Sequence, residues 1–183
     1  ALIVLLACGP DPNAPPPQPE GVLEVLEVET SGGEVSASDM VTGRNPGCVW
    51  GREIWQFDGR KVLVQNDVLC RGQRPDESYG CQVRAIADAT WDAERGMFVV
   101  PKRVGARGQF IGTKDSDIDP GPRTSCSVTV AAGEYPVARV RNGVWKWEMR
   151  TPAGMVLRFA RSDIKVDFGF AMAEAEKALG GKE

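Results

Sequence analysis

The fold is decided by residues 143–161, which read GVWKWEMRTPAGMVLRFAR. Two runs of apolar and aromatic residues flank residues 151–154, where Pro stands second and Gly fourth, as in a type I turn followed by a glycine bulge. Antiparallel pairing around this turn joins an apolar pair, an aromatic pair and an oppositely charged pair: Met149 with Leu157, Trp147 with Phe159, and Glu148 with Arg158. Because all three pairs are compatible, the stretch predicts a β-hairpin.

Similar short apolar runs fill the chain before this hairpin, and turn signals separate them. Asp58-Gly59 predicts a second hairpin, in which a two-residue turn places Trp55 opposite Val62. Residues 81–87, CQVRAIA, alternate between apolar and polar side chains, as expected of a half-buried strand. Further strands are predicted at residues 97–101, 125–132 and 135–141, the last of them joined to the final hairpin by Asn142-Gly143.

Two segments complete the predicted fold. Residues 22–29, VLEVLEVE, fit either a strand or a short helix with glutamates on one side. After Asp167, which can cap a helix, residues 168–179 carry an apolar stripe of helical spacing: Phe168, Met172, Ala175 and Leu179. About eight short strands and then a helix predict an all-β fold, an antiparallel meander closed into an up-and-down barrel with a C-terminal helix. A β-sandwich is the alternative.

The first residues resemble the end of an export signal. Residues 1–7 are uncharged and apolar, and Leu5-Leu6-Ala7-Cys8 resembles the lipobox of bacterial lipoproteins. The resemblance implies an acylated Cys8 that anchors the chain in the bacterial cell envelope, and Gly9 favours the outer membrane, facing the periplasm or the exterior. Residues 8–21 carry six prolines and predict an extended tether. Residues 22–183 are then a single β-rich domain.

The cysteines agree with export. Without Cys8, four remain, and an even number in an exported chain predicts two disulfides. The preferred pairing joins Cys70 to Cys81, which closes the polar loop between them, and Cys48 to Cys126. Two other pairings stay open: Cys48–Cys70 with Cys81–Cys126, and Cys48–Cys81 with Cys70–Cys126.

The body of the chain resembles bacterial lipocalin-like domains of the calycin group. The resemblance rests on WGREIWQFDG at residues 50–59, on the meander and on the closing hairpin. Lipocalins carry Gly-x-Trp near the first strand, where this chain has Gly47 and Trp50, and a late arginine that packs on the Trp, a role for Arg158 or Arg161. The resemblance implies a barrel that holds a small apolar ligand. The aromatic residues that would line its cavity are Trp55, Trp91, Trp145, Trp147 and Phe159.

Composition excludes several functions. The chain has no His, so His-based catalytic triads and His-ligated zinc sites are excluded, and its net charge of −3 argues against nucleic-acid binding. Asp115, Asp117 and Asp119 resemble the start of a calcium loop, but Pro120 stands where that loop needs Gly, so we predict no metal. No cofactor motif is present.

Three functions remain. The first is a non-catalytic lipoprotein that binds a small apolar ligand, and the second is a packed β-domain that serves as an envelope structural or protein-interaction module. The third is a carboxylate-based hydrolase. It requires Glu53, which alternates with Trp55, or an Asp to lie in a cleft with a strongly raised pKa and act as an acid or base.

Overall fold

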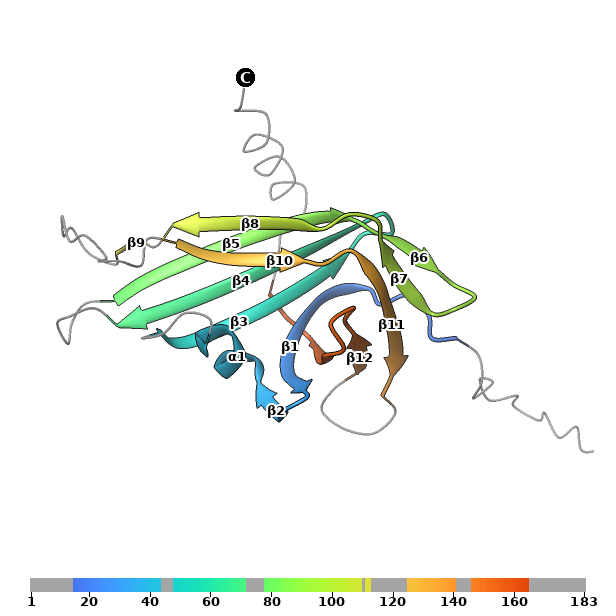
Figure 1. Ribbon diagram of the computed structural model, residues 1–183, viewed down its shortest axis with the longest axis horizontal. Coiled ribbons are helices and arrows are strands. Elements are labelled where there is room, and N and C mark those ends of the chain that lie inside the picture. The colour runs from blue at the N-terminus through green and yellow to red at the C-terminus, as the bar shows by residue number, and fades with distance from the viewer. Residues whose placement is uncertain are drawn as a thin grey trace, which may run out of the picture.

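The computed structural model describes residues 15–43, 48–71, 78–109, 111–112, 125–140 and 146–164 (Figure 1). Within them the chain is mostly antiparallel β-structure with one short helix, α1 (Ala37–Gly43). The strands are β1 (Gly21–Thr30), β2 (Gly33–Ser36), β3 (Cys48–Phe57), β4 (Lys61–Arg71), β5 (Ser78–Asp88), β6 (Thr90–Asp92), β7 (Met97–Val100), β8 (Val104–Gln109), β9 (Ile111–Gly112), β10 (Ser125–Val130), β11 (Gly133–Arg139), β12 (Trp147–Arg150) and β13 (Val156–Arg161). The predicted all-β class is confirmed. The predicted helix at 168–179 lies outside the described residues.

The strands form one long sheet that curls into a half-barrel (Figure 1). Its order is β6-β7-β11-β12-β13-β1-β3-β4-β5-β9, with β2 paired to β1, and β8 and β10 form a separate ladder. Register shifts interrupt β1 between Val25 and Glu27 and β3 between Cys48 and Trp50. Such bulges increase local twist and bend a strand, which helps the sheet to curl.

The final hairpin has the predicted register. Strands β12 and β13 pair Trp147 with Phe159, Glu148 with Arg158 and Met149 with Leu157. The turn closes through the backbone N–H of Gly154, which donates to the carbonyl oxygen of Thr151 at 2.9 Å, and Gly154 has a φ of 85°. A residue with a side chain is strained at that φ, so glycine in this position determines the turn.

The β3–β4 register differs from the prediction. Trp55 lies opposite Val64, not Val62, and Phe57 takes the place opposite Val62. The N–H of Asp58 donates to the carbonyl oxygen of Lys61 at 3.2 Å, so the tight turn lies one residue later, at Gly59-Arg60, and the pairing across it shifts by two. The carboxylate of Asp58 supports this turn by accepting hydrogen bonds from the backbone N–H groups of Arg60 and Lys61. Since a shift of two keeps each side chain on its face, Trp55 still points into the core.

Residues 22–29 form a strand, β1, which pairs with both β13 and β3. The ambiguity between helix and strand is thus resolved by tertiary pairing. Before β1, Pro19 is fully buried, and a Cβ at Gly96 would lie 2.8 Å from Pro16. The last residues of the predicted tether therefore pack against the domain.

The preferred disulfide pairing is wrong. The structure joins Cys48 to Cys70 and Cys81 to Cys126, one of the alternatives left open. The β4–β5 register puts Cys70 opposite Tyr79 and Cys81 opposite Val68, so the two cysteines lie two positions apart along these paired strands and not opposite each other. Cys70 instead faces Cys48 directly across β3 and β4.

The second disulfide holds the β8–β10 ladder to the main sheet. Cys126 in β10 pairs with Gly108 in β8, and Cys81 belongs to β5. A Cβ at Gly108 would lie 2.8 Å from the carbonyl oxygen of Gln82 and 3.1 Å from the Sγ of Cys81. Because Gly108 has no side chain, β8 can approach β5 closely, and the Cys81–Cys126 disulfide fits beside Gly108.

Helix α1 packs on β3. The Ser36 hydroxyl accepts a hydrogen bond from the N–H of Asp39, as an N-cap residue does, and Val41 is fully buried. The Oγ of Ser38 accepts the N–H of Gly51 at 3.1 Å. The short sequence ASDMVTG has too few apolar positions to predict this helix, whose buried residues are Ala37 and Val41.

We expect Gly51→Val to destabilise the protein by about 1–3 kcal/mol, the usual cost of overpacking. An ideal Cβ at Gly51 would lie 2.5 Å from Cγ1 of Val41, so the helix would have to move away from β3. Urea unfolding measures the change, with Gly80→Val in β5 as the control, because a Cβ there meets nothing within 4 Å. Equal losses for the two variants would contradict the close packing.

Candidate functional site

The candidate site is a small cleft between several strands and the helix. Its volume is about 90 Å³. Strands β3 and β4 form one side, and α1, the end of β10 and the β12–β13 turn form the others. The lining residues are Met40, Glu53, Trp55, Val64, Val128, Thr129, Ala131, Tyr135, Thr151, Pro152, Ala153, Met155 and Leu157.

The cleft contains a buried carboxylate. Glu53 is 5% exposed and lies on the inner face of β3 with Trp55, two residues further along the strand. The Nε1–H of Trp55 donates to Oε1 of Glu53 at 2.8 Å. Asn66 on β4 lies opposite Glu53. When its side-chain nitrogen faces Glu53, that nitrogen donates to Oε2 of Glu53 at 3.3 Å. Each carboxylate oxygen of Glu53 therefore has a hydrogen-bond donor from a neighbouring side chain.

Tyr135 forms the opposite wall. Its hydroxyl donates to the carbonyl oxygen of Ala131 at 2.8 Å, and its ring centroid lies 6.0 Å from that of Trp55. Burial, chiefly, and the charge of Glu53 raise the pKa of Tyr135 to about 12. Tyr135 and Glu53 therefore share one poorly hydrated environment.

We expect Tyr135 to remain protonated in the folded protein until about pH 12, whereas a tyrosine in the unfolded chain ionises near pH 10. The unfolded state then loses a proton that the folded state keeps, so stability falls as pH rises from about 10 to 12. Ultraviolet absorbance of tyrosinate, measured on the folded protein, follows the ionisation, and Tyr135→Phe should remove the late step. Persistence of that step in the variant would contradict the assignment.

The predicted ligand-lining aromatics have different positions. Trp55 lines the cleft, whereas Phe159 lies in the core with its ring edge towards Trp55, at 6.1 Å between centroids. Trp91 packs on Phe98 at the other end of the sheet, and Trp147 is partly buried in β12. Trp145 lies outside the described residues. Of the predicted aromatics that the structure describes, only Trp55 therefore lines the cleft, and the others pack against neighbouring side chains.

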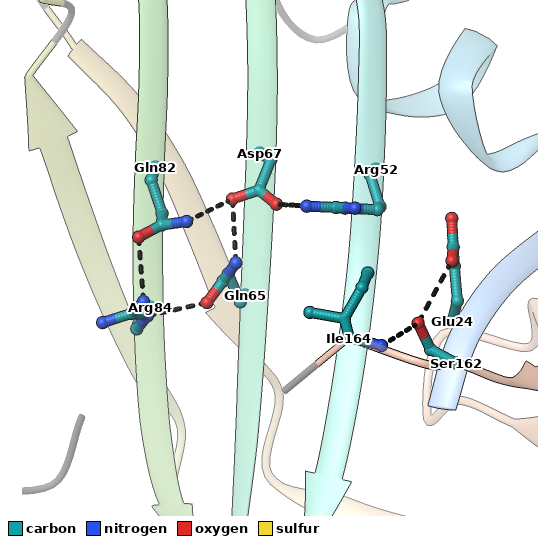
Figure 2. Close-up of polar contacts among 8 residues, drawn as sticks. All are labelled: Glu24, Arg52, Gln65, Asp67, Gln82, Arg84, Ser162 and Ile164. Atoms are coloured by element: carbon teal, nitrogen blue, oxygen red, sulfur yellow. Dashed lines mark hydrogen bonds and ion pairs between the residues drawn. The ribbon is translucent and has the colours of Figure 1, made fainter. Parts of the chain in front are cut away.

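The outer face of β3, β4 and β5 carries a polar network (Figure 2). Asp67 accepts from Arg52 Nε at 3.0 Å and from both Gln65 and Gln82 at 2.9 Å. Arg84 extends the network by donating to both glutamines. In the same view Ser162 lies between Glu24 and Ile164. Because these polar groups form hydrogen bonds mainly with one another, we infer that the network stabilises the sheet.

Arg158, one of the two arginines considered for the lipocalin-like contact, lies among four glutamates. Its guanidinium donates to glutamates on β1, β2 and β12: Glu27, Glu29, Glu34 and Glu148. The hydrogen bonds that it donates to these carboxylates, chiefly the one to Glu148, raise the pKa of Arg158 above its usual value. The arginine over the Trp50 ring is instead Arg52, 5.3 Å from its centroid.

Two residues that contact the cleft's Glu53 and Trp55 were not identified from the sequence: Asn66, which donates to Glu53, and Tyr135, which lines the cleft beside Trp55. The run Gln65-Asn66-Asp67 in the middle of an apolar strand is a signal that polar groups are needed there, since such strands usually stay apolar. Tyr135 gave no signal of its own, because its proximity to Glu53 depends on how β11 folds back over β3.

Cys8, Asp115, Asp117 and Asp119 lie outside the described residues. Among the residues that are described, no group of three or more Cys, Asp or Glu side chains is arranged to hold a metal ion. Within the same ranges, no helix is long and apolar enough to span a membrane.

The cleft meets one requirement of the hydrolase hypothesis, because Glu53 is buried and lines a hollow. It supplies a single carboxylate, however, among the lining residues named above. Hydrolysis by paired carboxylates needs a second carboxylate on the other side of the substrate.

Comparisons with protein-family models, curated proteins and solved structures find no match to this chain.

Proposed function

We propose that this chain is a lipid-anchored protein of the bacterial cell envelope whose β-domain acts through its surface as a structural or protein-interaction module. Acylation of Cys8 would attach it to the outer membrane, and the proline-rich segment would hold the domain away from the lipid. The observation that carries the proposal is the packed interior of the half-barrel.

The packing of the interior is dense and aromatic. Phe57 stacks on Phe98 with ring centroids 4.0 Å apart, and Trp55 contacts Phe57, Tyr135 and Phe159 at about 6 Å. Pockets for drug-sized apolar ligands usually have volumes of about 300–1,000 Å³. A cleft of about 90 Å³ with a carboxylate in it suits such a ligand poorly. The packed module is therefore better supported than a carrier of apolar ligands.

We further propose that the half-barrel closes as a lipocalin-like barrel. Strand β8 runs on into β9, which pairs with β5, and β10 precedes β11, which pairs with β12. The β8–β10 ladder would then fill the space between β5 and β11, and Cys81–Cys126 would secure it there. A closed barrel has no free strand edges, which protects it from aggregation.

An exposed apolar patch is the best-placed surface for a protein partner. Trp50 and Leu69 face each other across β3 and β4 and are 42% and 36% exposed, and Val49 lies beside them in the bulge. Arg52 extends over the Trp50 ring. Trp and Arg are the side chains that most often dominate the binding energy at protein interfaces. The Cys48–Cys70 disulfide joins β3 to β4 directly beside the patch.

A photo-crosslinking amino acid at position 50, introduced in cells, tests this surface. We expect a specific adduct from position 50 but not from Ser127, an exposed position on β10. The trapped protein should bind the purified domain, and Trp50→Ala should weaken that binding by at least about tenfold. An unchanged affinity for the variant would overturn the assignment of the patch.

The anchor has its own test. Cys8→Ala should prevent acylation, so metabolic labelling with palmitate should fail and unprocessed precursor should accumulate. Fatty-acid labelling of the Cys8→Ala protein, or normal processing of it, would show that Cys8 is not the lipidated residue.

A further inference from the structure

The exposed patch of Val49, Trp50 and Leu69 continues onto β5 as an open space. The β4–β5 register places Gly80 directly opposite Leu69, which itself lies opposite Trp50. Residues paired in this way project from the same face of the sheet, so the three positions form one row on its outer face. A Cβ at Gly80 would meet nothing within 4 Å. The row therefore presents two apolar side chains and, next to them, backbone with no side chain above it.

A positive charge lies beside this row. Arg71 follows Leu69 by two residues on β4, so it lies on the same face of the strand, about 7 Å further along. It is exposed, and among the residues that the structure describes no hydrogen bond or ion pair engages its side chain. On the other side of the row, Arg52 is paired with Asp67 (Figure 2), so these two charges compensate each other. The uncompensated charge of the patch is therefore positive and belongs to Arg71.

We propose, on the basis of the protein-interaction surface proposed above, that the partner of this patch presents an apolar side chain and a carboxylate on the same side of an extended segment. The apolar side chain would fill the open space at Gly80, in contact with Leu69, and the carboxylate would pair with Arg71. The apolar contact would supply most of the affinity, and the ion pair would select the partner and orient it.

Shape and charge argue against two other occupants. A lipid surface would also attract Trp50 and Arg71, but membrane binding grows with the buried apolar area, and the three exposed apolar side chains of the patch supply little of it. An open space left by one missing side chain instead suits a single side chain of a protein. A partner with Lys or Arg at this contact would be repelled by Arg71.

The experiment is a titration of the folded protein with blocked peptides, followed by amide and indole NMR shifts. The probe is acetyl-Gly-Leu-Gly-Asp-Gly-amide, in which Leu and Asp lie on the same side of an extended chain. We expect saturable shifts at the Trp50 indole N–H and at the amides of residues 69, 71 and 80. Replacing Asp by Asn in the peptide should weaken binding by at least about threefold, because an ion pair is lost, and replacing Leu by Ala by about tenfold.

Gly80→Val tests the open space most sharply, because the new side chain fills it without meeting a neighbour. This variant should keep the stability of the wild-type protein and weaken binding of the Asp peptide by at least about tenfold. Arg71→Gln should abolish the preference for the Asp peptide over the Asn peptide. The matched control is Lys61→Gln, on the same face at the other end of β4, where it lies opposite Asp88. It should change neither the affinity nor the preference.

The protein trapped by crosslinking at position 50 separates this inference from the function on which it rests. We expect Gly80→Val and Arg71→Gln to weaken its binding as they weaken that of the Asp peptide. If Trp50→Ala weakens the binding of the trapped protein but neither of these variants does, the patch is still an interaction surface and the acidic, apolar partner is wrong. If Trp50→Ala has no effect either, the interaction surface fails with it.

Three further results would overturn the acidic, apolar partner. The first is the absence of saturable shifts with the Asp peptide, and the second is equal affinity for a peptide with Lys in place of Asp. The third is binding to phosphatidylglycerol vesicles that Trp50→Ala abolishes and Gly80→Val leaves unchanged, which would identify the occupant as a lipid surface.

Discussion

Removal of the Cys81–Cys126 disulfide, by Cys81→Ala with Cys126→Ala, should lower the free energy of unfolding by about 4 kcal/mol. The bond closes a segment with a sequence separation of 45 residues, and the chain-entropy estimate for such a loop is roughly that size. The effect should also be local. Strands β8 and β10 pair with each other, and β9 joins β5 through two residue pairs, Tyr79 with Gly112 and Gly80 with Ile111. Without the disulfide the ladder should detach before the rest of the sheet.

Urea unfolding measures the overall loss, and hydrogen exchange of the β8 and β10 amides measures the local one. The matched control is Cys48→Ala with Cys70→Ala, which opens a shorter segment, with a separation of 22 residues, and should cost about 3 kcal/mol. That control should leave exchange in β8 and β10 unchanged. Equal exchange in the two double variants would contradict a specific role of Cys81–Cys126 in holding the ladder.

Trp55→Ala should destabilise the domain by about 3–5 kcal/mol, the range for removal of a buried tryptophan. Its ring packs against Phe57, Tyr135 and Phe159, so its loss leaves a cavity where these rings meet. The variant also removes the donor to Oε1 of Glu53, and a buried carboxylate that loses a donor adds to the cost.

Trp55→Phe separates the two contributions, because it keeps most of the apolar contact and removes the indole N–H. We expect it to cost about 1–3 kcal/mol, and to cost less in a Glu53→Gln background than alone, since a neutral amide needs the donor less. Thermal and urea unfolding of the four proteins in this cycle give the coupling. An additive result would show that the Trp55–Glu53 hydrogen bond contributes nothing to stability.

The sequence predicted best where local chemistry determines structure. The register around Thr151-Pro152-Ala153-Gly154 was predictable because the proline, the glycine and three cross-strand pairs all require the same turn. The prediction for the turn at Asp58 was wrong because the position of the turn depends on side-chain hydrogen bonds that the Asp-Gly signal does not specify. The consequence was small, since a shift of two residues keeps Trp55 on the inner face.

Long-range features were harder to predict. The disulfide pairing follows from the order and register of the strands. The predicted Cys70–Cys81 pair rested only on the closeness of these two residues in sequence. Glu53 was identified from its alternation with Trp55, and its burial in a cleft fits that pattern. Tyr135 was missed because its contact with this cluster depends on a segment about eighty residues away in the chain, a distance that local patterns do not bridge.

The central claim is that the domain has a packed interior and acts through its surface. Two measurements together test it most directly: titration with an apolar fluorescent probe such as N-phenylnaphthylamine, and native mass spectrometry. We expect no saturable binding of the probe and a mass equal to that of the chain processed at Cys8, with two disulfides and its N-terminal acyl groups. One bound lipid per chain, released on denaturation and displaced by the probe, would contradict a packed interior.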